Sequence, residues 1–392
     1  MSIAICSAGF GFASDMVIIP LVTALQNDFP AANELLFSFV ISGNAIVAMV
    51  FGLSTAFLMK FFRKKTLLIF GLMAFLIGGV GGYFCNSLQS LAILRSIDAA
   101  SDGILTVTQA SLIIDLWREE KEQNSIFALA HIIPLIFGTL FSIVAGYAAQ
   151  VNWHYAFLSD AVVIIPLVLC IIFIPKNDIS KGVSNRKEVT TEVQSNVSFK
   201  PFIFALIVLV YICAQSINYS IAMLQDVYIF EQNIGNSVLT GYMSLVTLVT
   251  GITSDLSTIS ILPRFKKKQL FATLYLLIMA SAFVIFSVNH GVIGMIIATI
   301  LNYISNTWMN IYFKMYAARS IPRNRQALCI GILSQVAYIS TALCTLIPSV
   351  TAYLFKTETI AQCCGICAII LTVFAAIFAV AAMTAKKADY QY

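Results

Sequence analysis

Twelve apolar runs, each about as long as a bilayer-spanning helix, follow one another along almost the whole chain. A helix needs about 20 mostly apolar residues to cross a membrane. Lipid offers no hydrogen bonds, so each run must satisfy its backbone groups as a helix. The runs cover residues 3–26, 35–59, 66–85, 88–116, 125–149, 155–175, 201–226, 236–262, 269–288, 291–316, 326–350 and 359–384. The pattern predicts an all-α membrane protein with twelve transmembrane helices.

The composition agrees with this prediction. Of the 392 residues, 59% are hydrophobic and only 10% are charged, whereas a soluble domain has about 25% charged residues. Such a chain has too little polar surface to cover a water-soluble globule. A bilayer removes that requirement.

The placement of Lys and Arg predicts the orientation. The loops on the N-terminal side of the membrane hold 20 Lys and Arg residues, and the opposite loops hold only Lys356. Basic residues are enriched in cytoplasmic loops. We therefore expect a multi-pass protein of the cell membrane, either plasma or bacterial inner membrane, with both termini in the cytoplasm.

One long polar stretch divides the runs into two sets of six. Residues 176–200 mix Lys, Asp, Ser, Asn and Glu without an apolar period, and we interpret them as a cytoplasmic linker between bundles at 1–175 and 201–392. The tetrapeptide at 62–65, Phe-Arg-Lys-Lys, matches Phe-Lys-Lys-Lys at 265–268. The halves therefore look like a parallel repeat of two pseudo-symmetric six-helix bundles, which places a substrate site between them near the midplane.

The fourth run has a polar stripe. Its members recur at spacings of 3, 4, 4 and 3, which is one face of a helix: Arg95, Asp98, Asp102, Thr106 and Gln109. Arg95 is expected to neutralise Asp98 one turn away. Asp102 then holds a proton readily, because loss of water and a nearby acid both disfavour its charge. The stripe is thus a candidate proton-coupling and substrate-binding surface; the alternative is a static polar knot that fixes helix packing.

The second half has neutral polar stripes on its first and fourth runs. These are Tyr211, Gln215, Asn218 and Tyr219, and then Asn302, Asn306 and Asn310. Amides and phenols in a cavity orient a ligand by hydrogen bonds. The alternative is that they bond the two helices to each other.

Several function classes find no support. The chain has no G-x-x-x-x-G-K-[ST] motif for ATP and no nucleophile–base arrangement, so an enzyme is not expected. The three histidines are dispersed, and Cys364 and Cys367 lack a second ligand pair, so no metal or other cofactor is expected. We expect a monomer that interacts with a small-molecule substrate, protons and the lipid bilayer, and not with nucleic acid.

Several motifs resemble those of the major facilitator superfamily, in particular its twelve-helix drug/proton antiporter branch. The first run reads Asp15-Met-Val-Ile-Ile-Pro20, similar to that branch's P-x-x-P segment. The loop at 55–64 resembles the family's G-x-L-x-D-R-x-G-R-K, with Met59 in the place of the acid. Leu91-x-x-x-Arg95 is similar to the family's membrane-embedded arginine motif, and the stretch 153–157 resembles its W-R-W-x-F.

The resemblance implies roles for several further residues. It places Asp15 beside the central cavity as a proton or substrate contact, or as a packing residue near Pro20. It implies a cytoplasmic gate, for which the candidates are Arg63, Asp115, Glu119 and Asp255. Asp160, near the outer end of the sixth run, is expected to reach water. The glycines at 78, 79, 81 and 82 are expected to allow close helix contact.

These features favour proton-coupled export of a small amphipathic or cationic organic compound. The reason is the surplus of acids in the first half, where Asp15, Asp98 and Asp102 face one arginine. Uptake of a small polar metabolite by proton symport is the alternative. The Asn-rich tenth run favours it, as does a fifth run that keeps only Pro134, Gly138 and Gly146 of the branch's Gly/Pro-rich motif. A third class is a transporter-like receptor without turnover.

Overall fold

The structure is a computed structural model that describes residues 2–7, 11–117, 120–174, 201–261, 268–289, 291–320 and 336–384. These residues form helices joined by short turns, and no strand occurs among them. The chain divides into two compact units, Met1–Asn196 and Val197–Tyr392, which are described separately. The predicted linker at 176–200 lies outside the described residues.

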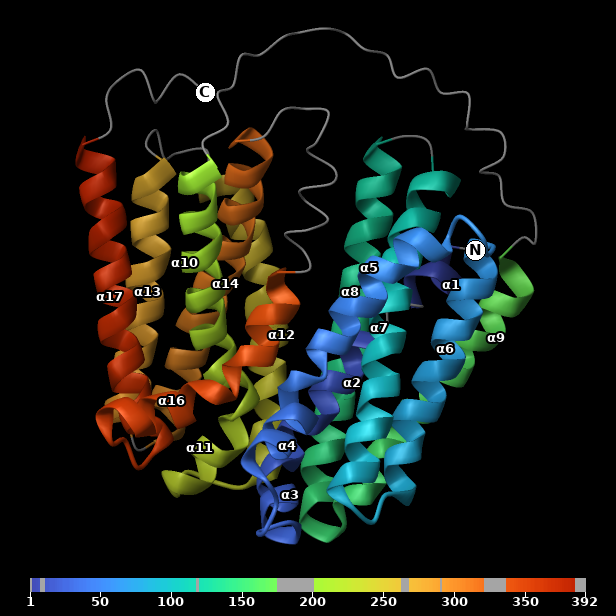
Figure 1. Cartoon of the computed structure of the whole chain (residues 1–392), viewed down its shortest axis with the longest axis horizontal. Helices are drawn as coiled ribbons and strands as arrows, with labels where there is room; N and C mark the ends of the chain where they lie inside the picture. Colours follow the sequence, from blue (N-terminus) through green and yellow to red (C-terminus); the bar gives the residue numbers. More distant parts are fainter. Residues whose placement is uncertain are drawn as a thin grey trace, which may run out of the picture. The chain divides into compact units, whose positions relative to one another are not determined.

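The first unit contains the helices of the first six predicted runs (Figure 1). They are α1 (Ser2–Ser7), α2 (Gly11–Ile18), the 3-10 helix η1 (Ile19–Leu21), α3 (Val22–Asp28), α4 (Glu34–Ser38), the π-helix η2 (Phe39–Gly43), α5 (Ala45–Leu58), α6 (Lys64–Gly81), the 3-10 helix η3 (Gly82–Phe84), α7 (Leu88–Leu116), α8 (Glu120–Val151), the 3-10 helix η4 (Trp153–Val163) and α9 (Ile164–Phe173).

The second unit contains the other helices, among which α13 packs against both α14 and α17. They are α10 (Pro201–Met223), α11 (Gln225–Glu231), α12 (Ser237–Ile261), α13 (Lys268–Val288), α14 (Val292–Ser320), the helical segment Val336–Cys344, α16 (Leu346–Phe355) and α17 (Ile360–Thr384).

Seven of the described helices are long and apolar enough to cross a membrane, and three bent pairs bring the number to ten. The two remaining predicted runs are 3–26 and 88–116. The first is divided among α1, α2, η1 and α3, with Pro20 inside η1. The second is α7, which has 29 residues but carries an arginine and two aspartates near its centre.

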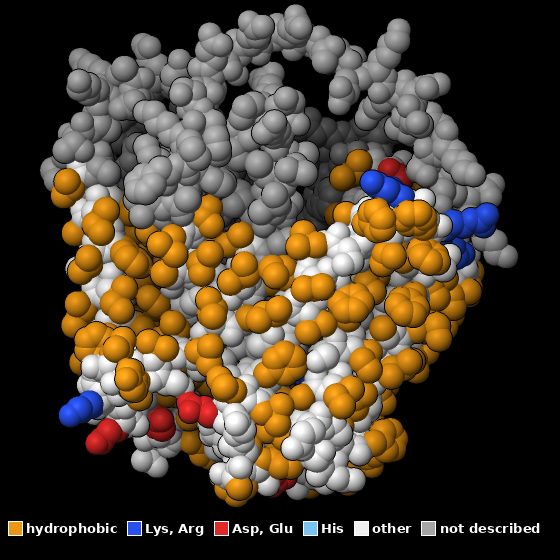
Figure 2. Space-filling view, viewed as in Figure 1, with side chains coloured by type: hydrophobic (Ala, Val, Ile, Leu, Met, Phe, Trp, Pro, Cys, Tyr) orange, Lys and Arg blue, Asp and Glu red, His pale blue; other side chains and the backbone are white. Residues whose placement is uncertain are grey.

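The outer faces of the helices are apolar. Large hydrophobic side chains such as Phe70, Ile93 and Ile293 are 60%, 63% and 76% exposed. On the face seen in Figure 2, orange side chains cover the described helices and the described charged groups lie near helix ends. Apolar surface of this extent is unfavourable in water, and it suits contact with lipid.

Glycines bring α6 very close to its neighbours, as predicted from the sequence. A Cβ atom on Gly78 would lie 2.6 Å from the backbone nitrogen of Asp98, and one on Gly81 would lie 2.9 Å from a methyl group of Leu94. A Cβ atom on Gly82 would lie 2.6 Å from the ring of Phe157. Because these glycines have no side chains, α7 packs closely on α6, and η4 packs closely on both α6 and η3, which begins at Gly82.

Candidate functional site

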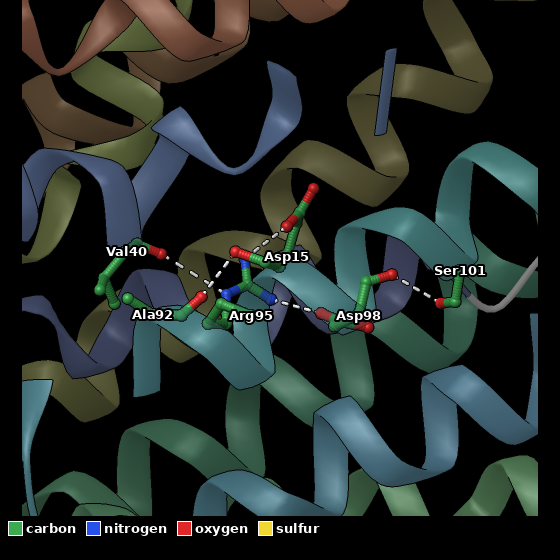
Figure 3. A network of polar contacts seen from close by, with 7 residues as sticks. Asp15, Val40, Ala92, Arg95, Asp98 and Ser101 are labelled. Atoms are coloured by element: carbon green, nitrogen blue, oxygen red, sulfur yellow. Dashed lines mark hydrogen bonds and ion pairs between the residues drawn. The ribbon is translucent and has the colours of Figure 1, made fainter. Parts of the chain in front are cut away.

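The centre of α7 carries a buried ion cluster with one base and two acids. Arg95 donates from Nη1 to Oδ2 of Asp98 at 2.6 Å and from Nη2 to Oδ1 of Asp15 at 2.7 Å. Its Nε donates to the carbonyl oxygen of Val40 at 3.5 Å. The guanidinium therefore joins α7 to α2 and to the π-helix η2, and Figure 3 shows Asp15 and Asp98 approaching it from different sides.

The two acids of this cluster differ in exposure. The Asp98 side chain is 4% exposed and that of Arg95 is 2% exposed, whereas the Asp15 side chain is 38% exposed. Asp98 is also fixed through its backbone, because the hydroxyl of Ser101 donates to its carbonyl oxygen at 2.6 Å. With both acids ionised the cluster has one negative charge in excess, and Asp15 is the member that solvent or a ligand reaches.

The predicted pairing of Arg95 with Asp98 is confirmed. Its pairing with Asp15, 80 positions away, was not predicted: helical spacing relates residues of one helix and says nothing about a neighbour's rotation. Asp15 was expected either to contact a proton or a substrate or to pack near Pro20; it forms this ion pair, and its contact with a proton or a substrate stays a prediction.

The rest of the α7 stripe does not share one environment. Asp102 is partly buried and accepts a hydrogen bond from Thr106, which is exposed, at 3.3 Å. Gln109 is buried, and its amide donates to the backbone carbonyls of Ile5 and Cys6 at 2.7 and 3.2 Å. These carbonyls lie in the last turn of α1, and the last four carbonyls of a helix have no partner within it, so Gln109 supports that helix end.

A second buried acid lies close to the cluster. Asp160, on η4, is 0% exposed, so the expectation that it reaches water is wrong. Neither of its carboxyl oxygens has a hydrogen-bond partner among the described residues. It interacts electrostatically with Arg95, Asp98 and Asp15. Its depth comes from the close packing of η4 on α6, which position along an apolar run does not reveal.

The predicted amides of the second unit bond to one another. Tyr211 donates its hydroxyl proton to Oδ1 of Asn310 at 2.6 Å. Gln215 donates to Oδ1 of Asn306 at 2.9 Å, and Asn218 donates to Oδ1 of Asn302 at 2.8 Å. All three bonds join α10 to α14.

This seam is only partly covered. Gln215 and Asn218 are 0% and 2% exposed, whereas Asn306, Asn310 and Tyr219 are partly exposed. For the buried Gln215 and Asn218, the arrangement matches the second interpretation of the polar stripes, in which they bond the two helices to each other. Contact of the partly exposed members with a substrate stays a prediction.

Sequence reasoning missed Asp226, at the start of α11. It is 0% exposed, and its Oδ1 accepts a hydrogen bond from the hydroxyl of Thr240 at 2.8 Å. The α10 and α11 axes differ by 58° at the break before it. The predicted run 201–226 ended at this residue, so an acid there did not look buried.

The gate candidates are only partly described. Asp115 pairs with Lys64 at 2.5 Å, and not with Arg63, which is exposed. The neighbouring Lys65 donates to the carbonyl oxygens of Ile171 and Ile174 at the end of α9. The start of α6 thus holds the ends of α7 and α9 together. Glu119 and the basic segment 264–267 lie outside the described residues, as does the side chain of Asp255.

Comparisons with known proteins identify the fold. A family model described as Major Facilitator Superfamily matches residues 1–345. The structure of a D-xylose-proton symporter is similar with a TM-score of 0.71 at 15% identity, over 96% of this chain and 97% of that one.

Two further solved structures are similar over comparable lengths. For a peptide transporter, POT, in complex with sulfate, the TM-score is 0.77 at 10% identity, over 97% of this chain and 94% of that one. For the nucleoside transporter NupG it is 0.70 at 12% identity, over 100% of both chains. No curated protein sequence matches the chain. The predicted all-α fold of twelve transmembrane helices in two bundles is confirmed.

Proposed function

The chain belongs to the major facilitator superfamily, and from that premise we propose that it is a proton-coupled exporter of small amphipathic or cationic organic compounds. Membership makes it a multi-pass secondary transporter rather than an enzyme. The proton coupling, the substrate class and the outward direction are the proposal.

The observation that carries the proposal is the cluster of Arg95 with two aspartates. One guanidinium balances one carboxylate, so the cluster has one negative charge in excess when both acids are ionised. A proton on Asp15 removes that excess and weakens the charged bond between α2 and α7. A ligand shifts a conformational equilibrium only through a difference in affinity for the two states, and protonation supplies that difference here.

A cationic substrate neutralises the same excess charge. If the proton and the cation compete for one carboxylate, occupation by one excludes the other, and each conformational cycle carries them in opposite directions. This competition is the physical basis of exchange, and it favours export driven by the inward proton gradient. Asp102 is the second candidate for the proton site, because it is partly exposed on the same helix.

Uptake by symport is the second candidate function. The partly exposed amides Asn306 and Asn310 on α14 are suited to a neutral, hydroxyl-rich solute, which needs donors and acceptors rather than a charge. The D-xylose-proton symporter with the same fold shows that this architecture accommodates such coupling. In that case the proton and the solute bind together, not in competition.

The sign of the effective proton gradient separates the two functions. Proteoliposomes are loaded so that the lumen is either acidic or alkaline, and accumulation of labelled tetraphenylphosphonium and of labelled neutral sugars is measured. Antiport predicts accumulation of the cation only with an acidic lumen. Accumulation of a neutral solute with an acidic exterior supports symport, and the absence of gradient-driven flux for every compound of a broad panel refutes proton coupling.

The Asp15→Asn variant tests the assignment of the cluster. It should lose gradient-driven accumulation and counterflow of the cation alike, because Asn carries no charge for which the proton and the cation compete. Asp102→Asn is measured in parallel, and Glu122→Gln, which changes an exposed acid of α8, is the matched control. Normal gradient-driven flux in Asp15→Asn would remove Asp15 from the coupling mechanism.

A further inference from the structure

Asp160 is completely buried and, among the described residues, lacks the hydrogen bonds that a structural acid normally has. Its carboxyl is 0% exposed, and both of its oxygens lack a hydrogen-bond partner among the described residues. Buried polar groups in proteins are nearly always hydrogen-bonded, and an exception calls for an explanation. An ionised carboxylate in such a position is more unfavourable still.

The position of this carboxyl is built by a glycine. A Cβ atom on Gly79 of α6 would lie 2.6 Å from Oδ2 of Asp160 and 2.8 Å from its Cβ. The neighbouring Gly78 allows the backbone of α7 to approach α6 at Asp98. Two adjacent glycines thus place Asp98 and Asp160 on either side of one turn of α6.

The charged groups that interact with Asp160 all belong to the ion cluster. Asp15 comes from α2, and Arg95 and Asp98 come from α7. From α6 the nearest contact is the glycine. No charged group of α8 or α9 is among these interacting groups within the described residues. Asp160 therefore has no cation of its own: Arg95 is the only base in its surroundings within the described chain, and both charged bonds of Arg95 go to other acids.

We propose that Asp160 is a buried proton-binding site, which holds its proton while Asp15 and Asp98 are ionised on Arg95 and exchanges it during transport. The proton is held as the O–H of the carboxyl. The proton is released to water only in the conformation in which η4 separates from Gly79. The carboxylate takes a proton from water again before η4 packs back on Gly79. The coupling part of this inference rests on the proposed function, whereas the resting protonation state does not.

Infrared spectroscopy tests the resting state. The purified protein in lipid should show the carbonyl stretching band of a protonated carboxyl at neutral pH, and Asp160→Asn should lose it. Asp226→Asn is the matched control, because Asp226 is equally buried but accepts a hydrogen bond from Thr240, and this variant should keep the Asp160 band. Absence of the band from the wild type, or its survival in Asp160→Asn, overturns the proposal.

Transport tests the exchange of the proton. Asp160→Asn, which imitates the neutral acid, should keep substrate counterflow and lose gradient-driven accumulation; Asp160→Leu, with no polar group to bury, serves if the first variant does not fold. Wild-type accumulation in either folded variant overturns the coupling role. If the wild type has no gradient-driven flux, the proposed function fails, and the infrared result still decides the protonation of Asp160.

Discussion

Removal of the Arg95 guanidinium is the perturbation whose effect the structure defines best. In Arg95→Met the volume of the side chain is largely kept, but Asp98, with a side chain 4% exposed, loses its cation. Breaking a buried ion pair at one partner costs about 3–5 kcal/mol, because an uncompensated charge remains. Asp15 contributes less, since its side chain is 38% exposed and an exposed pair is worth about 1 kcal/mol or less.

The free energy of unfolding therefore decreases by about 3–5 kcal/mol in Arg95→Met. It is measured by titration of mixed micelles with sodium dodecyl sulfate, followed by circular dichroism. The double variant Arg95→Met/Asp98→Asn should lose less than the single one, because the buried charge leaves with its partner. Asp15→Asn should lose about 1 kcal/mol or less. If Arg95→Met unfolds within about 1 kcal/mol of the wild type, the cluster does not hold α7 as described.

Three further experiments test other contacts of the fold. Gly103→Ala should destabilise the protein by about 1–3 kcal/mol, because the new Cβ atom would lie 2.2 Å from a backbone oxygen of α5, whereas Gly291→Ala should be silent, because its new Cβ atom would lie 3.9 Å from Oδ1 of Asn289, an ordinary contact distance. Equal melting temperatures for the two variants would contradict this packing. A double-mutant cycle on Lys64 and Asp115, whose side chains are 13% and 26% exposed, should give a coupling of about 0.2–1 kcal/mol, and a value of zero would mean that the pair does not fasten α6 to α7. Asn302→Ala removes an acceptor between α10 and α14 and should cost about 0.6 kcal/mol in the same unfolding titration; a stabilised variant would show that the seam is strained.

Most of the fold was predictable from the sequence, since the length of an apolar run is a local property. The bends were not. The pairs around Asn44, Leu224 and Thr345 change direction by 46°, 58° and 56°. Hydropathy records how far a run extends, not where its axis turns. Only the bend at Thr345 has a proline beside it, Pro348, which is the usual sign of a kink; the bends at Asn44 and Leu224 have none nearby.

The site was predictable only within single helices. The i, i+3 spacing gave the pair of Arg95 and Asp98, and the i, i+4 spacing of the asparagines gave one face of α14. Which helix faces which depends on rotation and packing, so the ion pair to Asp15 and the depth of Asp160 required the structure. Gln109 shows the converse: its spacing fits the polar stripe, yet its amide supports the end of α1.

The two units differ in the chemistry that holds their central helices, and this difference locates the response to pH. Hydrogen bonds between side-chain amides, such as those that join α10 to α14, do not respond to pH, because Asn and Gln carry no ionisable group. The charged bond from α2 to α7 weakens when a proton binds to Asp15. Among the described residues, one acid in each unit is completely buried: Asp160 in the first unit and Asp226 in the second. Asp226 accepts a hydrogen bond from Thr240, whereas the carboxyl of Asp160 has no hydrogen-bond partner among the described residues. A hydrogen bond stabilises the ionised form of a carboxyl, so Asp226 has a partner for its charge and Asp160 does not. Under the proposed function, the proton-sensitive contacts are therefore those where α2, α6, α7 and η4 meet, and we expect a change in protonation there to alter the packing of the first unit while the seam between α10 and α14 keeps its hydrogen bonds.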